Sequence, residues 1–421
     1  MDSERTGPNN ARTPHTSFPM ALPSSILQEH LFAAKRRRAL LAAALAVCAA
    51  PGCGGNSIHQ ADPAVVKQYA DRGYAPAHHY ETAASQETWT VGAETVDVVL
   101  MVPAHAGTYP LVVYLPGLGE PPDAGAAWRK AWAQAGYAVL SAQPTRFGPA
   151  IWSSSAAHAG DFHSIAKDAF SARSLAARSQ LLKGILDEAS RRQSGAGGPT
   201  VARFDMSHMA VAGFDLGAQT AMVAAGARVG GVEPTPLTYG IKCVIALSPY
   251  ADFSGMGTQS NFADIRLPVL SVTSAADTDA YGLVTSAAVR RAPFQYMPAG
   301  QNMLLLLSVA PHSLLAGGVA SGQAGGKVGA NSTGVAIDEA AADPDIVGDE
   351  SDGRPRKKRR KPSASDTQVA RSSERAKEVT QVQAVTTAYL DALVADDALA
   401  LEWLTRNAPH WLGESADLIS K

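Results

Sequence analysis

The chain has 421 residues, which suits one α/β domain of roughly 250–300 residues with additional segments. Apolar residues make up 46%, enough for a sizeable core, and the net charge of −2 gives no overall bias toward nucleic acid or an anionic membrane. The cysteines, Cys48, Cys53 and Cys243, are too few for a cysteine-rich metal site or a disulfide scaffold.

The N-terminal segment has the layout of an export signal. Residues 1–34 are polar and irregular, and we interpret them as disordered or as preceding a later start such as Met20. Four basic residues at 35–38 then precede an apolar stretch over 39–50. This stretch is too short to span a bilayer and has the flanks of a secretory signal. We therefore expect a signal peptide over 35–53.

The end of this signal, Ala50-Pro51-Gly52-Cys53-Gly54, resembles a bacterial lipobox, in which the cysteine is lipidated and becomes the mature N-terminus. A leucine usually stands where this chain has Ala50. Cleavage before Cys53 would leave Cys243 as the one unmodified cysteine, which suits an exported protein without disulfides. The resemblance implies a lipoprotein anchored to a membrane of the bacterial cell envelope, or a secreted protein. The alternative is a cysteine that carries no lipid.

The next two segments are a predicted linker and a predicted hairpin. Residues 54–86 are rich in Ala, His and Tyr and read as a linker. Residues 88–102 alternate in character and are rich in β-branched side chains, so they predict an antiparallel hairpin with its turn near Gly92-Ala93. This hairpin would open a folded domain over 87–316.

Apolar runs and helical patterns alternate through this domain. The runs typical of buried strands cover 109–115, 137–141, a run beginning at Met209, 241–247, 267–273 and 303–309. Helices are predicted over 123–135, 162–192, from the end of the Met209 run to about residue 226, and 379–404. In the first of these, Trp128 and Trp132 share one face. Strands alternating with helices predict an α/β fold with a mostly parallel, doubly covered sheet.

An insert interrupts this pattern near the end of the chain. Residues 317–377 lose their apolar periodicity and become acidic at 338–352 and basic at 354–361. This composition is typical of disorder, and we favour a solvated loop over a nuclear-localisation or nucleic-acid patch. We expect residues 378–421 to form a closing helix that packs back on the sheet.

The chemistry centres on Gly213-Phe214-Asp215-Leu216-Gly217, between the run beginning at Met209 and a helix of small residues. This is the layout of a nucleophile elbow, a sharp strand-to-helix turn that needs small neighbours around a strained central residue. Gly213 and Gly217 supply that room. The usual central residue is Ser, and here it is Asp215.

Two further polar residues follow later strands. Asp277 comes after the run at 267–273, and His312 comes after the run at 303–309. In a parallel sheet, ligands bind beyond the carboxyl ends of the strands, so these side chains are expected to meet Asp215 there. The order of nucleophile, acid and histidine is that of α/β-hydrolases. Asp279 is the rival acid, and the sequence leaves the choice open.

At these residues the chain resembles the α/β-hydrolase superfamily, and within it the dienelactone hydrolase and platelet-activating-factor acetylhydrolase-like esterases. The motifs that carry the resemblance are Leu115-Pro116-Gly117-Leu118-Gly119, Gly213-Phe214-Asp215-Leu216-Gly217, Ala246-Leu247-Ser248-Pro249-Tyr250, Asp277-Thr278-Asp279-Ala280-Tyr281-Gly282 and Pro311-His312. The resemblance implies an exported hydrolase acting on a small ester-like substrate. It places Asp215 at the nucleophile, Asp277 at the acid, His312 at the base, and the backbone N–H groups of Leu118 and Leu216 at the oxyanion hole.

The elbow aspartate leaves three interpretations open. A carboxylate can form an alkyl-ester intermediate that a histidine-activated water hydrolyses, as in haloalkane dehalogenases and epoxide hydrolases of this superfamily. Those dehalogenases usually carry Trp where this chain has Leu216. In the second interpretation Asp215 or His312 activates water directly. In the third, the chain is an inactive, lipid-anchored binding protein of the same fold.

The sequence predicts a small-molecule substrate and a lipid anchor, with no cofactor, no metal and no nucleic-acid partner. Histidines such as His158, His163 and His208 lack the paired spacing of zinc sites, and Gly117-Leu118-Gly119 lacks the rest of a phosphate-binding fingerprint. Residues 143–162 are the expected lid, where Phe147 and Trp152 would line a pocket or belong to the core.

Overall fold

The computed structural model describes residues 61–195, 197–251, 258–318 and 364–421. The predicted N-terminal segment 1–34, the signal peptide and the lipidated Cys53 lie outside the described residues, as do residues 319–363 of the predicted insert. Within the described ranges, no helix is both long and apolar enough to cross a membrane.

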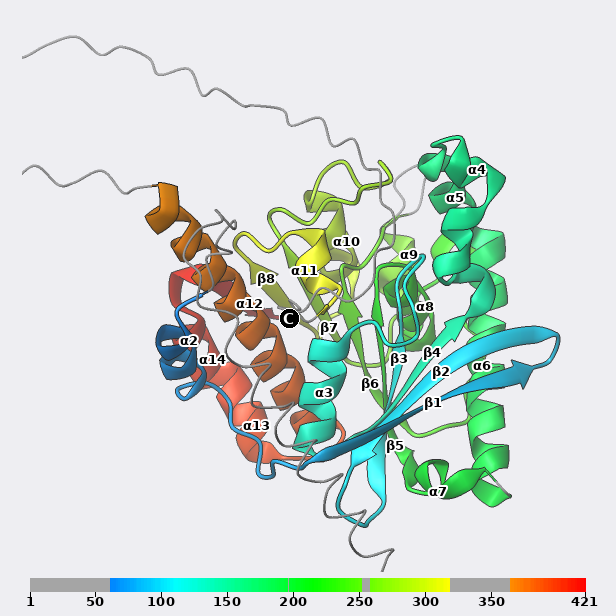
Figure 1. The fold of residues 1–421 in the computed structure, drawn as a ribbon, viewed down its shortest axis with the longest axis horizontal. Helices are drawn as coiled ribbons and strands as arrows, with labels where there is room; N and C mark the ends of the chain where they lie inside the picture. The colour runs from blue at the N-terminus through cyan, green and yellow to red at the C-terminus, as the bar shows by residue number, and fades with distance from the viewer. Residues whose placement is uncertain (1–60, 196, 252–257, 319–363) are drawn as a thin grey trace, which may run out of the picture. The chain divides into compact units, whose positions relative to one another are not determined.

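A twisted sheet runs through the described part of the chain (Figure 1). Its strands are β1 (Thr82–Val91), β2 (Glu94–Pro103), β3 (Tyr109–Leu115), β4 (Ala138–Pro144), β5 (Phe204–Phe214), β6 (Ile241–Leu247), β7 (Val269–Ser274), β8 (Met303–Leu307) and β9 (Ala416–Ser420). The strand order is β1-β2-β4-β3-β5-β6-β7-β8-β9. The six strands from β4 to β8 pair in parallel, whereas β1, β2 and β9 pair antiparallel. The predicted α/β class and its leading hairpin are confirmed.

Helices and short turns connect these strands. The α-helices are α2 (Pro63–Ala70), α3 (Ala126–Ala135), α4 (Ser155–His158), α5 (Phe162–Ala169), α6 (Ala172–Ser194), α7 (Gly198–Val201), α8 (Leu216–Ala225), α9 (Ser260–Ala263), α10 (Ala288–Tyr296), α11 (His312–Leu315), α12 (Ala364–Leu393), α13 (Ala398–Glu402) and α14 (Ala408–Leu412). Single turns are η1 (Thr145–Phe147), η2 (Pro149–Ser153), η3 (Val229–Gly231), η4 (Trp403–Asn407) and η5 (Gly413–Ser415).

Alternate side chains of the central strands enter two hydrophobic clusters. Leu111 and Val113 of β3 belong to a cluster with residues of α6 and α8, whereas Val112 and Tyr114 belong to a cluster with residues of α3 and α12. This alternation follows from the two-residue period of a strand and explains why β3 reads as a continuous apolar run. Trp128 and Trp132 of α3 are fully buried in the second cluster, as their spacing predicts.

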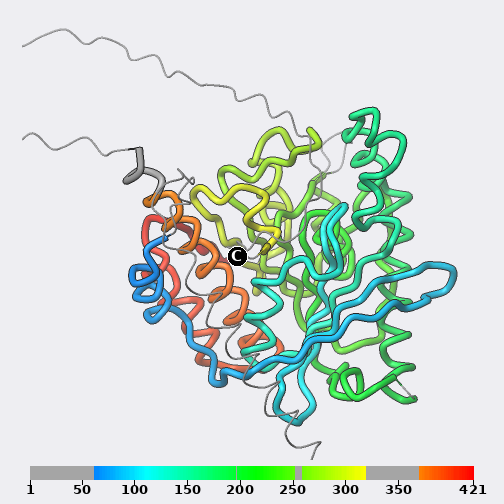
Figure 2. The backbone as a smooth tube through the Cα atoms, viewed as in Figure 1, coloured from blue at the N-terminus to red at the C-terminus, as the bar shows by residue number. Residues whose placement is uncertain are grey.

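The C-terminal region closes the second cluster. Helix α12 contacts α3 and strands β6, β7 and β8, and in Figure 2 its orange tube runs beside that of α3. The indole Nε1 of Trp132 in α3 donates a hydrogen bond of 3.0 Å to Oγ1 of Thr386 in α12. The prediction that residues after the insert pack back on the sheet is confirmed.

Several predicted boundaries are wrong. The helix expected over 162–192 is two helices, α5 and α6, because the Ser171 hydroxyl accepts the Ser174 N–H and caps a new helix. The expected linker 54–86 contains α2 and the first residues of β1. Asp62 caps α2, and the ring of Tyr69 in this helix stacks on Trp411 with centroids 4.7 Å apart.

The C-terminal boundaries also differ. Residues 364–377, expected in the disordered insert, form the first turns of α12, where the Ser373 hydroxyl accepts the N–H of Asp62, the cap residue of α2. The expected single closing helix over 378–421 is instead α12, four shorter helical segments (α13, η4, α14 and η5) and β9. Strand β9 pairs antiparallel with β8, with Leu418 of β9 opposite Leu305 of β8, and so becomes the edge strand of the sheet. Helix α3 begins at Ala126 and not at 123, and β8 ends at Leu307 and not at 309.

Candidate functional site

Asp215 occupies the sharp turn between β5 and α8. Its backbone has φ of 50° and ψ of −106°, a region that costs a non-glycine residue about 1–3 kcal/mol. A Cβ at Gly213 would overlap the backbone of Gly217, and a Cβ at Gly217 would overlap the carbonyl oxygen of Leu115. Both glycines are therefore required by close backbone approach, and the local geometry of an elbow is present around a carboxylate.

His312 and Asp277 form a hydrogen-bonded pair beside this turn. His312 Nδ1 lies 2.7 Å from Asp277 Oδ1, and its Nε2 lies 3.8 Å from Asp215 Oδ1. The hydroxyls of Ser248 and Thr273 donate to Asp277 Oδ2 at 2.8 and 2.7 Å. Asp277 thus fixes the imidazole so that Nε2 faces the elbow carboxylate.

The environment of Asp277 favours its ionised form. Burial raises the pKa of this carboxyl, but the hydrogen bond to His312 and the Arg290 charge lower it, and the net shift is below the ordinary value. Asp279 has a different role, because its carboxylate accepts the backbone N–H groups of Tyr281, Leu283 and Val284 at 2.6–3.1 Å. Of the two candidate acids, Asp277 contacts His312 and Asp279 shapes the loop.

Arg290 of α10 lies at the centre of the site and was not predicted. Its side chain is 0% exposed, and its Nη1 lies 3.3 Å from Asp215 Oδ1 and 2.7 Å from the Ser248 carbonyl oxygen. Its Nε and Nη2 lie 3.7 Å from Asp277 Oδ1 and 3.9 Å from Asp279 Oδ2. One guanidinium therefore faces three buried carboxylates.

The sequence offers little signal for this arginine. Arg290 is followed by Arg291 in a short amphipathic helix, where solvent exposure is the ordinary expectation. Its place is set by the tertiary fold and by Ser248, whose φ of 52° turns the carbonyl toward the guanidinium.

The loop after β3 lies against the other side of the elbow. Glu120 Oε2 accepts the Gly117 N–H at 2.7 Å, and Gln143 donates to the carbonyl oxygens of Gly117 and Glu120 at 2.9 and 2.7 Å. Burial, opposed by the Gly117 hydrogen bond and aided by the charge of Asp215, raises the pKa of Glu120 to about 7. Neither Glu120 nor Gln143 was predicted as a site residue.

The two amides predicted for an oxyanion hole are not used elsewhere in the described part of the chain. The N–H groups of Gly117 and Gly119 bind Glu120 and the Phe147 carbonyl, at 2.7 Å each. The backbone hydrogen bonds of the described residues include none donated by Leu118 or Leu216. Among the described residues, neither N–H group therefore has a hydrogen-bond partner.

In the expected lid over 143–162, the two aromatic residues Phe147 and Trp152 are packed, whereas many other residues of the segment are exposed. Trp152 donates through Nε1 to the Gly119 carbonyl at 3.2 Å and stacks on Tyr281 with ring centroids 5.6 Å apart. Phe147 is buried, with the Arg178 guanidinium 5.5 Å from its ring centroid. Phe147 belongs to a small apolar cluster with Leu118 and Leu216, the residue after Asp215, and Trp152 packs against this cluster.

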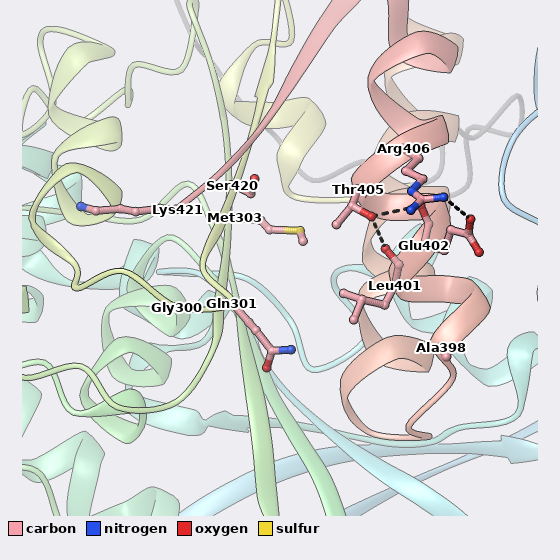
Figure 3. A pocket seen from close by; sticks show the side chains of 10 residues that line it. All are labelled: Gly300, Gln301, Met303, Ala398, Leu401, Glu402, Thr405, Arg406, Ser420 and Lys421. Carbon is pink, nitrogen blue, oxygen red and sulfur yellow. Dashed lines mark hydrogen bonds and ion pairs between the residues drawn. The ribbon is translucent and has the colours of Figure 1, made fainter.

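A cavity of about 770 Å³ lies elsewhere, between the β8–β9 edge and α13–η4 (Figure 3). Its lining includes Met303, Leu401 and Lys421 but none of Asp215, Asp277 or His312. This cavity is therefore separate from the site around Asp215. Among the residues the structure describes, no group of His, Cys, Asp and Glu side chains could hold a metal ion.

The described residues thus define an α/β protein in which a strained aspartate faces a histidine–aspartate pair and a buried arginine. No protein-family model matches the sequence, and a search of curated proteins finds no match.

Proposed function

We propose that the chain is a hydrolase with the α/β-hydrolase fold, acting on a small ester-like, epoxide or carbon-halogen substrate through Asp215. The fold proposal is supported by the mostly parallel sheet, by hydrophobic clusters on alternate residues of β3, and by the chain order of Asp215, Asp277 and His312. These clusters also favour the doubly covered sheet.

The observation that carries the functional proposal is the position of the imidazole. His312 Nε2 lies 3.8 Å from Asp215 Oδ1 while Nδ1 binds Asp277 at 2.7 Å. A histidine oriented by an acid and facing an elbow residue is the arrangement that activates a nucleophile or a water.

The reaction has two steps. The Asp215 carboxylate attacks a substrate carbon and forms an ester, while the leaving group departs with the bonding electron pair. His312 Nε2 then removes a proton from water, and the oxygen attacks the carbonyl carbon of that ester. The N–H groups of Leu118 and Leu216 stabilise the resulting oxyanion, worth about 3 kcal/mol per donor. Collapse expels the alkoxide, which takes the proton from His312 and leaves as the alcohol. The second proton of the water remains on the Asp215 carboxyl; its loss restores the carboxylate, and it leaves with a halide or carboxylate leaving group or protonates the alkoxide of an opened epoxide.

Attack at a saturated carbon suits a carboxylate better than attack at an ester carbonyl. Reaction of Asp215 with a carbonyl would give an anhydride and expel a poorer leaving group. We therefore rank epoxide and carbon-halogen substrates, and esters attacked at their alkyl carbon, above ordinary acyl transfer.

The experiment is a substrate screen with matched variants. 4-Nitrophenyl butyrate, γ-butyrolactone, styrene oxide and 1-bromobutane are offered to the wild type, Asp215→Asn and His312→Ala. We expect turnover of at least one compound that both variants lose. Equal turnover by the variants would exclude this site.

The second candidate is a binding protein without catalytic activity. It is favoured by the 3.3 Å contact between Arg290 and Asp215, because Asp215 is only 2% exposed and its charge is already paired. This candidate would be supported by a ligand that raises the melting temperature of the wild type but not of Asp215→Asn. The screen should then show no turnover.

We also propose lipidation at Cys53, which rests on the signal pattern over 35–53 alone. Metabolic labelling with a radioactive fatty acid should label the protein in a bacterial host. The Cys53→Ser variant should lose the label, and an unlabelled wild type would contradict the proposal.

A further inference from the structure

Glu378 of α12 is a buried carboxylate with an unusual set of partners. Its side chain is 1% exposed, and Oε1 accepts the backbone N–H of Val309 at 2.9 Å. The Ala310 N–H also binds this carboxylate. Oε2 has no hydrogen-bond partner, and no ion pair with Glu378 occurs in the described ranges.

The two amides belong to the turn that carries His312. Strand β8 ends at Leu307 and α11 begins at His312, so Val309 and Ala310 lie in the short link between them. Carboxylates rarely remain buried against backbone N–H groups alone, because charged groups prefer water or a cation. The fold therefore places the Glu378 carboxylate where it can accept hydrogen bonds from the N–H groups of Val309 and Ala310.

The same turn is held from the other side by β7. The hydroxyl of Ser274 donates to the Ala310 carbonyl and accepts the Ala276 N–H at 3.0 Å. Ala276 directly precedes Asp277. The N–H of Ala310 thus binds Glu378, and the carbonyl oxygen of Ala310 binds Ser274. Ser274 also binds the loop that carries Asp277.

We propose that Glu378 is a positioning residue for His312: α12 fixes the Val309–Ala310 link through Glu378 and so sets the imidazole between Asp277 and Asp215. Its effect on rate rests on the proposed function, but its effect on the orientation of His312 does not. The residue touches no reacting atom and acts through the turn.

Three variants separate this role from general stability. Glu378→Gln keeps an oxygen acceptor of the same length. Glu378→Leu has similar size and no acceptor, and Glu378→Asp retains the charge but withdraws it by one methylene. Glu374→Leu, one turn earlier on α12 and paired with Lys377 within the described residues, is the matched control.

The first measurement needs no substrate. In the wild type, the proton on His312 Nδ1 should give a downfield NMR resonance, and the Val309 and Ala310 amides should exchange slowly. Glu378→Leu should broaden or shift that resonance and speed amide exchange by about tenfold or more, whereas Glu378→Gln and Glu374→Leu should not.

The second measurement is kinetic, with whichever compound of the screen the wild type turns over. Glu378→Leu and Glu378→Asp should lower kcat about 10- to 100-fold with KM within about twofold, and Glu378→Gln should recover most of it. If Glu378→Leu does not fold, Glu378→Asp carries both measurements. A folded Glu378→Leu or Glu378→Asp with an unchanged His312 resonance and unchanged exchange would overturn the proposal. A changed resonance without turnover in any variant would uphold it and count against the hydrolase.

Discussion

Arg290 Nη1 lies 3.3 Å from Asp215 Oδ1, and both side chains are buried at the end of the sheet. The contact explains how an aspartate can occupy a cramped elbow. A buried carboxylate without a cation nearby is strongly disfavoured. Without Arg290, the carboxylates of Asp215, Asp277 and Asp279 would lie close together with no arginine to offset their charges. In the proposed reaction, Asp215 is therefore one member of an ion pair with Arg290.

The first prediction concerns that arginine. Arg290→Met removes the cation and leaves buried carboxylates uncompensated, so it should lower the free energy of unfolding by about 3–5 kcal/mol. Urea denaturation followed by circular dichroism measures this. Arg291→Met, next to it and partly exposed, should change stability by less than about 1 kcal/mol. A similar small effect at Arg290 would show that the contact does not stabilise the fold.

The second prediction distinguishes the two candidate acids. Asp277→Asn replaces the carboxylate that orients His312 and stabilises its protonated form with a neutral amide, so it should lower kcat by roughly 10³- to 10⁴-fold. Asp279→Asn disturbs three loop hydrogen bonds and should mainly reduce stability. Steady-state kinetics of both variants, checked by melting temperature, provide the comparison. A larger kinetic loss at Asp279 than at Asp277 would contradict the assignment.

The third prediction concerns Glu120 and pH. Its folded pKa of about 7 lies above the ordinary value of an unfolded glutamate, so the folded state binds the extra proton between roughly pH 4.5 and 7. The stabilisation that Glu120 contributes is fully present below this pH range and is lost as pH rises through it. Over this range the free energy of unfolding should fall by up to about 1.4 kcal/mol per pH unit.

The test is urea unfolding of the wild type and Glu120→Gln at several pH values from 4.5 to 8. The difference in unfolding free energy between the two proteins should shift in favour of Glu120→Gln as pH rises. A difference independent of pH would show that Glu120 titrates normally. Asp277 shifts in the opposite direction, and its contribution is lost only as pH falls below its ordinary range.

The fourth prediction concerns the elbow glycines. Gly217→Ala places a methyl group on the Leu115 carbonyl, so it should destabilise the chain by about 3 kcal/mol or more, or prevent folding. Gly318→Ala, where a Cβ meets no atom within 4 Å, should change stability by less than about 0.5 kcal/mol. Thermal melts of both variants measure the effect, and a well-folded Gly217→Ala would contradict the packing.

Much of the fold could be predicted because its signals are local. Apolar runs such as 109–115 mark buried parallel strands, and the alternation near Gly92 marks the hairpin. Asp277 and His312 could be placed near Asp215 because each follows a strand, and parallel strands end at one edge.

Other features depend on distant contacts. The break at Ser171 is hidden because apolar periodicity continues on both sides of it. Strand β9 forms where β8 offers an edge to pair with, and the polar start of α12 is helical with the Ser373 hydroxyl bonded to the Asp62 N–H at the cap of α2. Arg290 and Glu378 carry no periodic signal that separates them from exposed charges, so their burial beside the site could be found only in three dimensions.

The most direct test of the central claim is mass spectrometry of the His312→Ala variant after incubation with styrene oxide and with 1-bromobutane. Without the imidazole, water is not activated, so the account predicts that the peptide containing Asp215 gains one butyl group from 1-bromobutane or one hydroxyalkyl group from styrene oxide. The double variant Asp215→Asn, His312→Ala should gain neither. Wild-type turnover of either compound with Asp215 unmodified in the His312→Ala variant would contradict the claim that this carboxylate is the nucleophile.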